Sequence, residues 1–279
     1  MEIPAEPTAV LGLSGAGKTS LLNVLVGFTR PASGKIAGPA QVAWVPQDHG
    51  LWYGHTAVEQ LTLAGASSAE AMRLLADLDL DKCARAKPDR LSLGEAARLA
   101  VARALAQKAP VLVMDEPLAH VDSARIGKYW RIIREHMARS DSALLFATHQ
   151  PELALAEATH AICLRDGNVT FQGSIARLYN DPPNMEAATC LGPGNWITRD
   201  DAHTWLSQAW EAPRCIRPER LSIEPSPEGR LELTGHRFCG AHAESDLRSS
   251  AGALRTFIHR PSHALPVGAR VNLRILPDV

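Results

Sequence analysis

Short apolar runs alternate with helix-like stretches over about the first 180 residues of the chain. Apolar runs at 8–11, 111–114 and 143–148 are typical of strands that are buried on both faces of a parallel sheet. Apolar side chains recur at helical spacing over 122–139, and a further helical region is expected at about 55–95. This alternation predicts a layered α/β domain.

Finer signals mark individual elements. Ser67 and Glu70 have the spacing of a capping box, in which each side chain bonds to the other's backbone at the start of a helix. The Asp-Gly pair at 166–167 predicts a two-residue hairpin turn. The Gly- and Pro-rich stretch at 31–39 predicts turns around a short strand.

The helical pattern ends near a Pro- and Asn-rich stretch at 180–184, where a domain boundary is expected. Beyond it, Pro and Gly residues separate short β-forming runs, which predicts a small all-β barrel or sandwich. The expected strands lie at 215–217, 221–223, 231–234, 256–258 and 271–275. The chain is therefore expected to form two domains, at 1–182 and 186–279.

The overall composition argues against several classes of protein. Of the 279 residues, 46% are hydrophobic and 21% are charged, and the formal net charge of −1 gives no reason to expect a nucleic-acid partner. No secretory signal and no apolar run of about 20 residues is visible, so neither secretion nor a membrane span is expected. The five cysteines form no C-x-x-C pair, which favours free thiols over a metal site or a disulfide scaffold.

The most specific motif follows the first predicted strand. Residues 12–19 read GLSGAGKT and match G-x-x-x-x-G-K-[ST], the phosphate-binding loop of P-loop NTPases. Its glycines let backbone N–H groups wrap around phosphate oxygens, Lys18 can reach the β- and γ-phosphates, and the Thr19 hydroxyl can ligate Mg²⁺. The nucleotide-binding residues expected here are Gly12, Ser14, Gly15, Ala16, Gly17, Lys18, Thr19 and Ser20.

Two acidic residues, Asp115 and Glu116, end the apolar run at 111–114. The carboxyl end of a buried parallel strand is where open α/β sheets bind ligands. Asp115 can hold Mg²⁺, and Glu116 is placed to orient or deprotonate an attacking water. Together with the glycine-rich loop, the pair predicts a site for chemistry on a nucleotide phosphate.

Further motifs in order along the chain give a family resemblance. The segment LSLGE at 91–95, followed by Arg98, is similar to the LSGGQ signature of ATP-binding cassette (ABC) transporters. Gln47 matches the Q-loop of that family, 118–122 its D-loop and His149 its switch histidine. Residues 1 to about 180 therefore resemble the nucleotide-binding subunit of an ABC transporter, with the P-loop NTPase fold.

The resemblance implies roles for specific residues. The implied catalytic residues are Glu116, His149 and Gln47, and the implied Mg²⁺ ligands are Thr19, Gln47 and Asp115. Ser92 and the Gly94 backbone would reach ATP bound on a second subunit, and Asp122 of the D-loop is counted among the nucleotide contacts. Two ATP molecules would then lie between the subunits of a head-to-tail homodimer, or of a heterodimer with a similar subunit.

Several features depart from the family pattern. Leu93 replaces a signature glycine and restricts the backbone, and Glu95 replaces a glutamine and brings a carboxylate near another anion, so both are expected to weaken dimer closure. The sequence before Gly12 is short for the family, and no aromatic residue precedes Lys18 to stack on adenine. Gln47 also follows Lys18 at short spacing, which indicates a pared-down antiparallel subdomain.

The C-terminal region resembles the TOBE-type accessory domain of importer ATPases, on the segments 214–219 and 268–273. That resemblance implies an importer for sugars, polyamines, oxyanions or ferric iron. Its basic residues are interpreted as a solvated face rather than an anion site. They include Arg214, Arg217, Arg220 and Arg230.

The favoured function is that of the ATP-binding and ATP-hydrolysing subunit of an importer, peripheral to the cytoplasmic face of the membrane. Its implied partners are transmembrane permease subunits, a second ATP-binding subunit and, indirectly, an extracytoplasmic solute-binding protein. One alternative is a soluble cassette ATPase outside transport, although no second cassette, long coiled coil or basic surface is visible. The other is a degenerate or regulatory cassette with weak ATPase activity, which Leu93 and Glu95 keep open.

Overall fold

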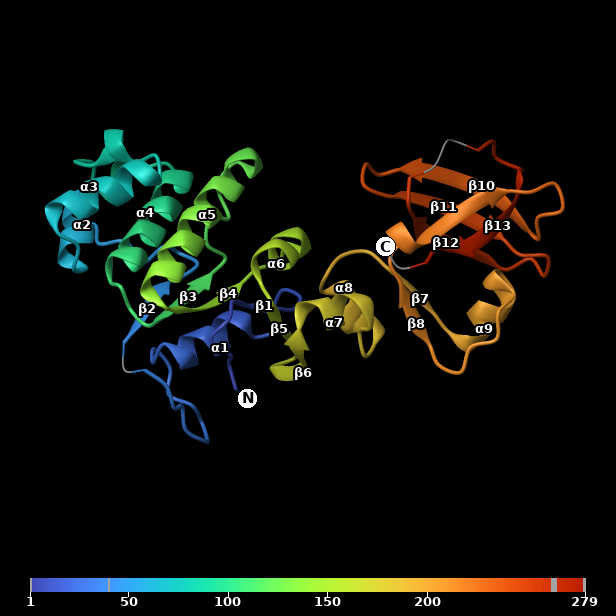
Figure 1. Ribbon diagram of the computed structural model, residues 1–279, viewed down its shortest axis with the longest axis horizontal. Coiled ribbons are helices and arrows are strands. Elements are labelled where there is room, and N and C mark those ends of the chain that lie inside the picture. The colour runs from blue at the N-terminus through green and yellow to red at the C-terminus, as the bar shows by residue number, and fades with distance from the viewer. Residues whose placement is uncertain (1, 40, 262–264, 278–279) are drawn as a thin grey trace. The chain divides into compact units, whose positions relative to one another are not determined.

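The computed structural model describes residues 2–39, 41–261 and 265–277, and the chain divides into two compact units, Met1–Ile175 and Ala176–Val279 (Figure 1). Each unit has its own sheet and its own core of buried apolar residues. The domain limits expected from the sequence, 1–182 and 186–279, stay a prediction.

The first unit is built on a six-stranded sheet in the order β2-β3-β4-β1-β5-β6. All neighbouring strands are parallel except β5 and β6, which form the predicted hairpin. At its turn, Asp166 and Gly167 both have positive φ, as a two-residue turn of this kind requires. The strands are β1 (Thr8–Leu11), β2 (Val42–Val45), β3 (Val111–Asp115), β4 (Ala143–Ala147), β5 (His160–Arg165) and β6 (Asn168–Ser174).

Helices cover both faces of this sheet. In Figure 1, α1 (Lys18–Leu25) lies on one side of the parallel strands, and α4 (Leu93–Ala106) and α5 (Ser123–Ser140) lie on the other. The fully buried Trp130 of α5 packs against Phe146 of β4, with ring centroids 4.8 Å apart. The remaining helical elements are α2 (Ala57–Leu63), α3 (Ser68–Asp77), α6 (Pro151–Glu157) and the 3₁₀ turns Asp81–Cys83 and Pro88–Arg90.

The start of α3 agrees with the sequence prediction, whereas the segment 31–39 does not. Ser67 and Glu70 form the predicted capping box of α3. The prediction of a strand within 31–39 is wrong: those residues are all described, and they form bends and irregular backbone without a strand. Gly and Pro residues there favour bent backbone over the extended conformation of a strand.

The second unit carries a five-stranded antiparallel sheet in the order β12-β11-β10-β13-β9, and a small pair, β7-β8. Arg260 N donates to Leu221 O at 3.0 Å, so the chain just beyond β12 meets the start of β9 and the sheet curls towards a barrel. The strands are β7 (Asn195–Ile197), β8 (Arg214–Ile216), β9 (Leu221–Pro225), β10 (Leu231–Phe238), β11 (Ala243–Arg248), β12 (Leu254–His259) and β13 (Arg270–Ile275).

The prediction of a C-terminal region built mainly from β-strands is confirmed, but this region also contains helices. The sequence did not predict β7 or β11, nor the helical elements of this unit. These are α7 (Ile175–Asn180), α8 (Met185–Thr189), α9 (Arg199–Asp201), the π-helical turn Ala202–Leu206 and the 3₁₀ turn Pro218–Arg220.

The interpretation of the basic residues as a solvated face is wrong for Arg217, which is buried. Its side chain is only 2% exposed and lies over the ring of Tyr179, with 4.3 Å from the guanidinium carbon to the ring centroid. The guanidinium donates to the carbonyl oxygens of Tyr179, Gly192 and Pro193 at 3.0–3.2 Å. Arg217 therefore satisfies three backbone carbonyl groups inside the second unit, whereas Arg214 is exposed as expected.

Replacing Arg217 with Met tests this structural role. The variant leaves three carbonyl oxygens short of a donor, so the free energy of unfolding of the second unit should fall by about 3 kcal/mol. Urea denaturation followed by tryptophan fluorescence measures it. Arg214→Met is the matched control, because Arg214 lies over the Trp210 ring but in solvent, and should cost about 1 kcal/mol or less. Equal losses in the two variants would contradict the assignment.

Candidate functional site

The glycine-rich loop connects β1 to α1 and has the conformation that its glycines allow. Gly12, Gly15 and Gly17 have φ of 149°, 82° and 100°. At Gly12 a side chain is also excluded by space, because a Cβ there would lie 2.5 Å from the Leu164 carbonyl oxygen. Gly167 N donates to Ala16 O at 3.1 Å, so the β5–β6 turn supports the loop from outside.

Lys18 is held against the glycine-rich loop by backbone carbonyl groups. Lys18 Nζ donates to Gly12 O at 2.8 Å and to Leu13 O at 3.2 Å, which holds the ammonium group across the loop. Ser14 is exposed in the loop, and Ser20 is exposed in the first turn of α1. Backbone N–H groups at a helix start, with a cation beside them, form an anion-binding site.

Thr19 and Asp115 come together from distant parts of the sequence. Thr19 Oγ1 donates to Asp115 Oδ2 at 2.6 Å, although 96 residues separate them. Burial is the main reason that the pKa of Asp115 is raised, and its side chain is almost fully enclosed. Adjacent oxygen ligands of Mg²⁺ lie about 3 Å apart when each is about 2.1 Å from the ion, so these two oxygens suit Mg²⁺.

Glu116 and His149 form a second pair at the same edge of the sheet. They follow the paired ends of β3 and β4, and His149 Nδ1 lies 3.0 Å from Glu116 Oε1. Glu116 has a φ of 47°, which is uncommon for a residue with a side chain, and its N–H donates to Ala147 O at 3.0 Å. The turn therefore holds the carboxylate next to an imidazole that is itself well exposed.

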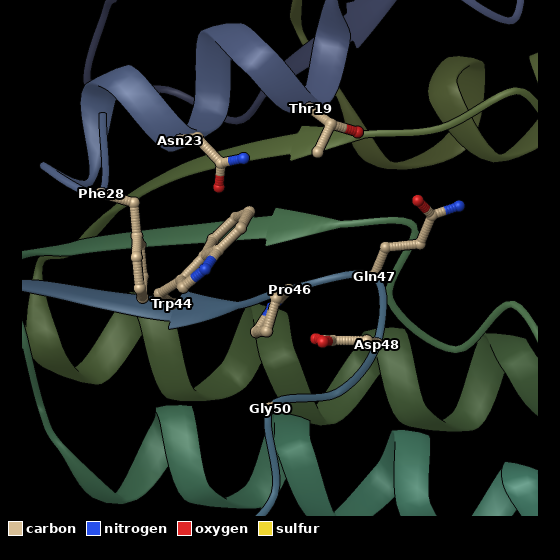
Figure 2. A pocket seen from close by; sticks show the side chains of 8 residues that line it. All are labelled: Thr19, Asn23, Phe28, Trp44, Pro46, Gln47, Asp48 and Gly50. Atoms are coloured by element: carbon tan, nitrogen blue, oxygen red, sulfur yellow. The ribbon is translucent and has the colours of Figure 1, made fainter. Parts of the chain in front are cut away.

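Gln47 follows β2 and shares a pocket of about 640 Å³ with Thr19. Figure 2 shows Thr19 and Gln47 towards one end of this pocket and the aromatic side chains of Phe28 and Trp44 towards the other. Sequence reasoning placed Gln47 but missed the two aromatic residues. The sequence signal that could have found them is Phe28, a large apolar residue directly after Gly27. Gly27 follows the end of α1 and has a φ of 82°.

Arg103 of α4 fixes the loop that closes this pocket. Its guanidinium donates to Gly50 O at 2.5 Å and to His49 O at 3.2 Å, and it lies over the Trp52 ring. Burial lowers the pKa of Arg103 from its high ordinary value, and the loop carbonyls compensate for the lost water. The loop after Gln47 is therefore attached to the same helix that carries the signature segment.

The signature residues are held by contacts at the start of α4 and with the D-loop at 118–122. Ser92 is the N-cap of α4 and exchanges hydrogen bonds with Glu95, whose carboxylate accepts from the Ser92 N–H and hydroxyl at 2.8 Å. Gly94 packs against the D-loop, because a Cβ there would lie 2.9 Å from His120 O. Within the described ranges, no hydrogen bond links 92–94 to 12–20. Asp122 is the N-cap residue of α5, and its side chain is exposed.

Comparison with known proteins agrees with this geometry. Residues 3–119 match the family model described as ABC transporter. An Fe(3+) ions import ATP-binding protein of Rhizobium meliloti (strain 1021) is 28% identical, over 98% of this chain and 88% of that protein. A thiamine import ATP-binding protein of Cereibacter sphaeroides is 34% identical, over 67% of this chain and 89% of that protein.

Solved structures show the same likeness in three dimensions. One is described as the ATP-binding subunit of an ABC transporter, with a TM-score of 0.57 and 26% identity over 62% of this chain and 80% of that one. Another is a dimeric ATP-binding cassette in a post-hydrolysis state bound to ADP and Pi, with a TM-score of 0.57 and 25% identity over 63% and 88%. Together with the motifs and the fold, these likenesses show that the chain belongs to the ABC transporter family, as an ATP-binding and ATP-hydrolysing subunit of the import type.

Proposed function

We propose that this subunit hydrolyses Mg²⁺-bound ATP in a site that a second cassette completes, and that this drives solute uptake through separate permease subunits. The observation that supports the proposal best is the convergence of two pairs at one edge of the sheet. Thr19 with Asp115 offers oxygen ligands, and Glu116 with His149 offers a base beside an imidazole.

Different residues of the chain would bind Mg²⁺, bind the phosphates and activate the attacking water. Thr19, Asp115 and Gln47 would hold Mg²⁺, which when bound supplies positive charge to the β- and γ-phosphates. Lys18 exchanges the carbonyl oxygens of Gly12 and Leu13 for phosphate oxygens. Glu116 orients the attacking water and accepts its proton, while His149 positions the γ-phosphate and the water.

We propose a second subunit because, among the described residues, no hydrogen bond joins 92–94 to the glycine-rich loop of their own chain. In the proposed head-to-tail dimer, Ser92, the Gly94 backbone and the D-loop around Asp122 face the nucleotide of the partner. The likeness to a cassette that was solved as a dimer supports this arrangement. Binding energy that ATP gains only in the closed dimer would drive closure, and hydrolysis would release it.

The pocket beside Gln47 is the proposed docking point for a permease segment. Phe28, which is 74% exposed, lines this pocket together with the partly buried Trp44. Apolar side chains gathered at one place on a surface are a mark of a protein interface. Of the described helices, none is both long and apolar enough to cross a membrane. The likeness to import ATP-binding proteins supports a location at the cytoplasmic face of the membrane, peripheral to the proposed permeases.

The solute belongs to the small ions and polar molecules named for the relatives, which include Fe(3+) and thiamine. An extracytoplasmic solute-binding protein would deliver it. The curled β-sheet of the second unit fits the TOBE-like accessory domain expected from the sequence. The alternative, a regulatory cassette with weak turnover, draws support from the ionised Glu95 in the signature.

Glu116→Gln tests the role of Glu116. It should retain ATP affinity, lower steady-state ATP hydrolysis by at least about 100-fold because no base accepts the water's proton, and accumulate an ATP-bound dimer. Phosphate release and sedimentation velocity measure the two effects. The control Glu135→Gln changes an exposed carboxylate of α5 and should leave turnover unchanged. Undiminished turnover of Glu116→Gln would refute the assignment.

Glu95→Gln separates the proposed ATPase from the weak, regulatory alternative. Hydrogen bonds from the Ser92 backbone and hydroxyl lower the pKa of Glu95, so the carboxylate is charged at neutral pH and would oppose the partner's phosphates. Glutamine can keep the capping box without the charge. ATP-dependent dimerisation in the Glu116→Gln background should then tighten at least about threefold.

The matched control for that substitution is Glu59→Gln, which makes the same change in the capping box of α2. It should leave the dissociation constant of the ATP-dependent dimer unchanged. If the dissociation constant of the Glu95→Gln dimer is unchanged, as expected for Glu59→Gln, the Glu95 carboxylate does not oppose closure. The replacement of the family's glutamine by Glu95 then has no electrostatic effect on the dimer.

Phe28→Ser tests the docking pocket. The substitution removes an exposed aromatic ring from the rim, so co-purification with the proposed permease subunits, co-expressed with this chain, should fall by at least about tenfold. ATP affinity is measured in parallel to confirm that the cassette is folded. Val169→Ser, at an exposed apolar residue of β6, is the control and should co-purify like the parent. Equal recovery of permease with both variants would exclude the pocket.

A further inference from the structure

The turn between β10 and β11 gathers three side chains of different chemistry. Cys239 N donates to His242 O at 2.9 Å, so these two residues oppose each other at the end of the hairpin. Arg237 and Glu244 form the pair two positions along. Because successive residues of a strand alternate between the two faces of a sheet, Cys239, His242 and Glu244 share one face.

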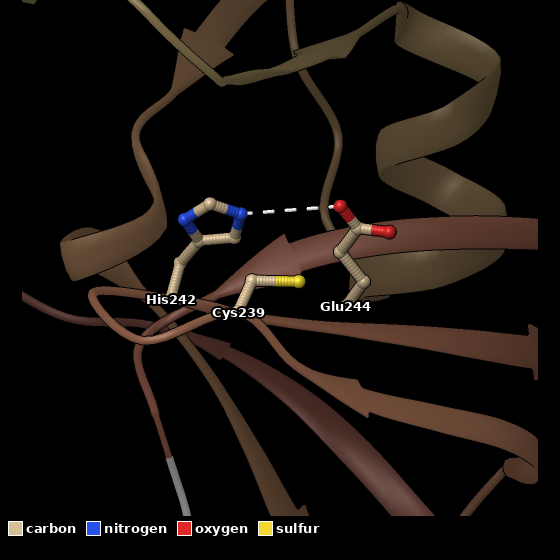
Figure 3. Close-up of side chains that lie close together, drawn as sticks. All are labelled: Cys239, His242 and Glu244. Atoms are coloured by element: carbon tan, nitrogen blue, oxygen red, sulfur yellow. Dashed lines mark ion pairs between the residues drawn. The ribbon is translucent and has the colours of Figure 1, made fainter.

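The ligand atoms of these three residues are close together. One atom of each, the Cys239 sulfur, a His242 ring nitrogen and a Glu244 carboxylate oxygen, lies within 4.8 Å of the other two. Figure 3 shows the three side chains projecting from the hairpin, with His242 Nε2 and Glu244 Oε1 3.9 Å apart. It is the one His, Cys, Asp and Glu cluster of this kind in the part of the chain that the structure describes.

We propose that Cys239, His242 and Glu244 form a binding site for a divalent transition-metal ion of the Zn²⁺ type. A thiolate, an imidazole and a carboxylate are all ligands that Zn²⁺ takes, whereas Mg²⁺ and Ca²⁺ select oxygen alone. Zinc–ligand bonds of about 2.0–2.3 Å put tetrahedral ligand atoms about 3.5 Å apart, so the side chains need to close in by about 1 Å. Three protein ligands leave a fourth position for water.

One neighbouring cation competes for the site. The Arg237 guanidinium is ion-paired with Glu244, which raises the pKa of Arg237. The Arg237 side chain is mostly exposed and can turn into water when an ion replaces it. Metal binding is thus an exchange of one positive partner of Glu244 for another, and removal of the guanidinium should strengthen it.

The cysteine is available for this role. Cys239 is the exposed cysteine of the chain, while Cys163 is buried and the other three are partly covered. Zn²⁺ binds cysteine through the sulfur as a thiolate, and the exposed sulfur of Cys239 can be reached by an ion from solvent. Spacing between cysteines could not reveal the site, because only one of its ligands is a cysteine.

The test is titration of the reduced, full-length, untagged protein with Co²⁺ in the absence of nucleotide. Ligation by Cys239 predicts a sulfur-to-cobalt charge-transfer band that saturates at one ion per chain and is displaced by Zn²⁺. The oxygen ligands Thr19 and Asp115 cannot produce such a band, so the outcome does not depend on the proposed ATPase function.

Single substitutions assign the ligands. Cys239→Ser should abolish the charge-transfer band, and His242→Gln and Glu244→Gln should each weaken Zn²⁺ binding at least about tenfold. Arg237→Gln should tighten it, an effect that a purely structural hairpin would not show. Cys83→Ser is the matched control, because its thiol also contacts a carboxylate, that of Glu95 at 3.3 Å, and it should bind Zn²⁺ like the parent.

A second measurement covers variants that fold poorly. Zn²⁺ should slow the reaction of Cys239 with an aromatic disulfide reagent in the parent protein but not in His242→Gln. Absence of a charge-transfer band in the parent, a band that persists in Cys239→Ser, or unchanged thiol reactivity with Zn²⁺ would each overturn the proposal.

Discussion

The hydrogen bond between Thr19 and Asp115 is the contact on which the arrangement of the site depends. It joins the first turn of α1 to the end of β3, and β4 and β1 are the next strands of the sheet. Because these three strands are parallel and adjacent, the glycine-rich loop, the acidic pair and His149 all emerge at one edge. Groups from three separate parts of the sequence thus converge without any long loop.

Residues whose type fixes a local conformation were predictable from the sequence. Gly12 and Gly17 adopt backbone angles that glycine alone adopts easily, and Asp166-Gly167 has the turn that it encodes. The continuous apolar runs became β1, β3 and β4 because both faces of those strands are covered by helices. Motif order singled out Asp115, Glu116 and His149, and the structure places Asp115 beside Thr19 and Glu116 beside His149.

Features that depend on tertiary contacts were not predictable. The strand β11 reads AESDLR, whose small and charged residues give little β signal, yet Ala243, Ser245 and Leu247 point to the core. Arg217 looks like a surface residue by type, and only the carbonyl groups around it show why it is buried. A rule based on cysteine spacing could not find a cluster in which strand register supplies the histidine and the carboxylate.

Helix α4 connects the two ends of the proposed mechanism. Its first turn carries Ser92 and Gly94, and its last turn carries Arg103, which holds the loop carbonyls beside the pocket at Gln47. With 14 residues and a rise of about 1.5 Å per residue, it is a stiff rod about 21 Å long. Arg98 attaches it along the way to Leu78 O and the Tyr129 hydroxyl. In the proposed dimer, a displacement of the signature end along this helix would carry the pocket loop with it, so α4 alone could link subunit closure to the pocket.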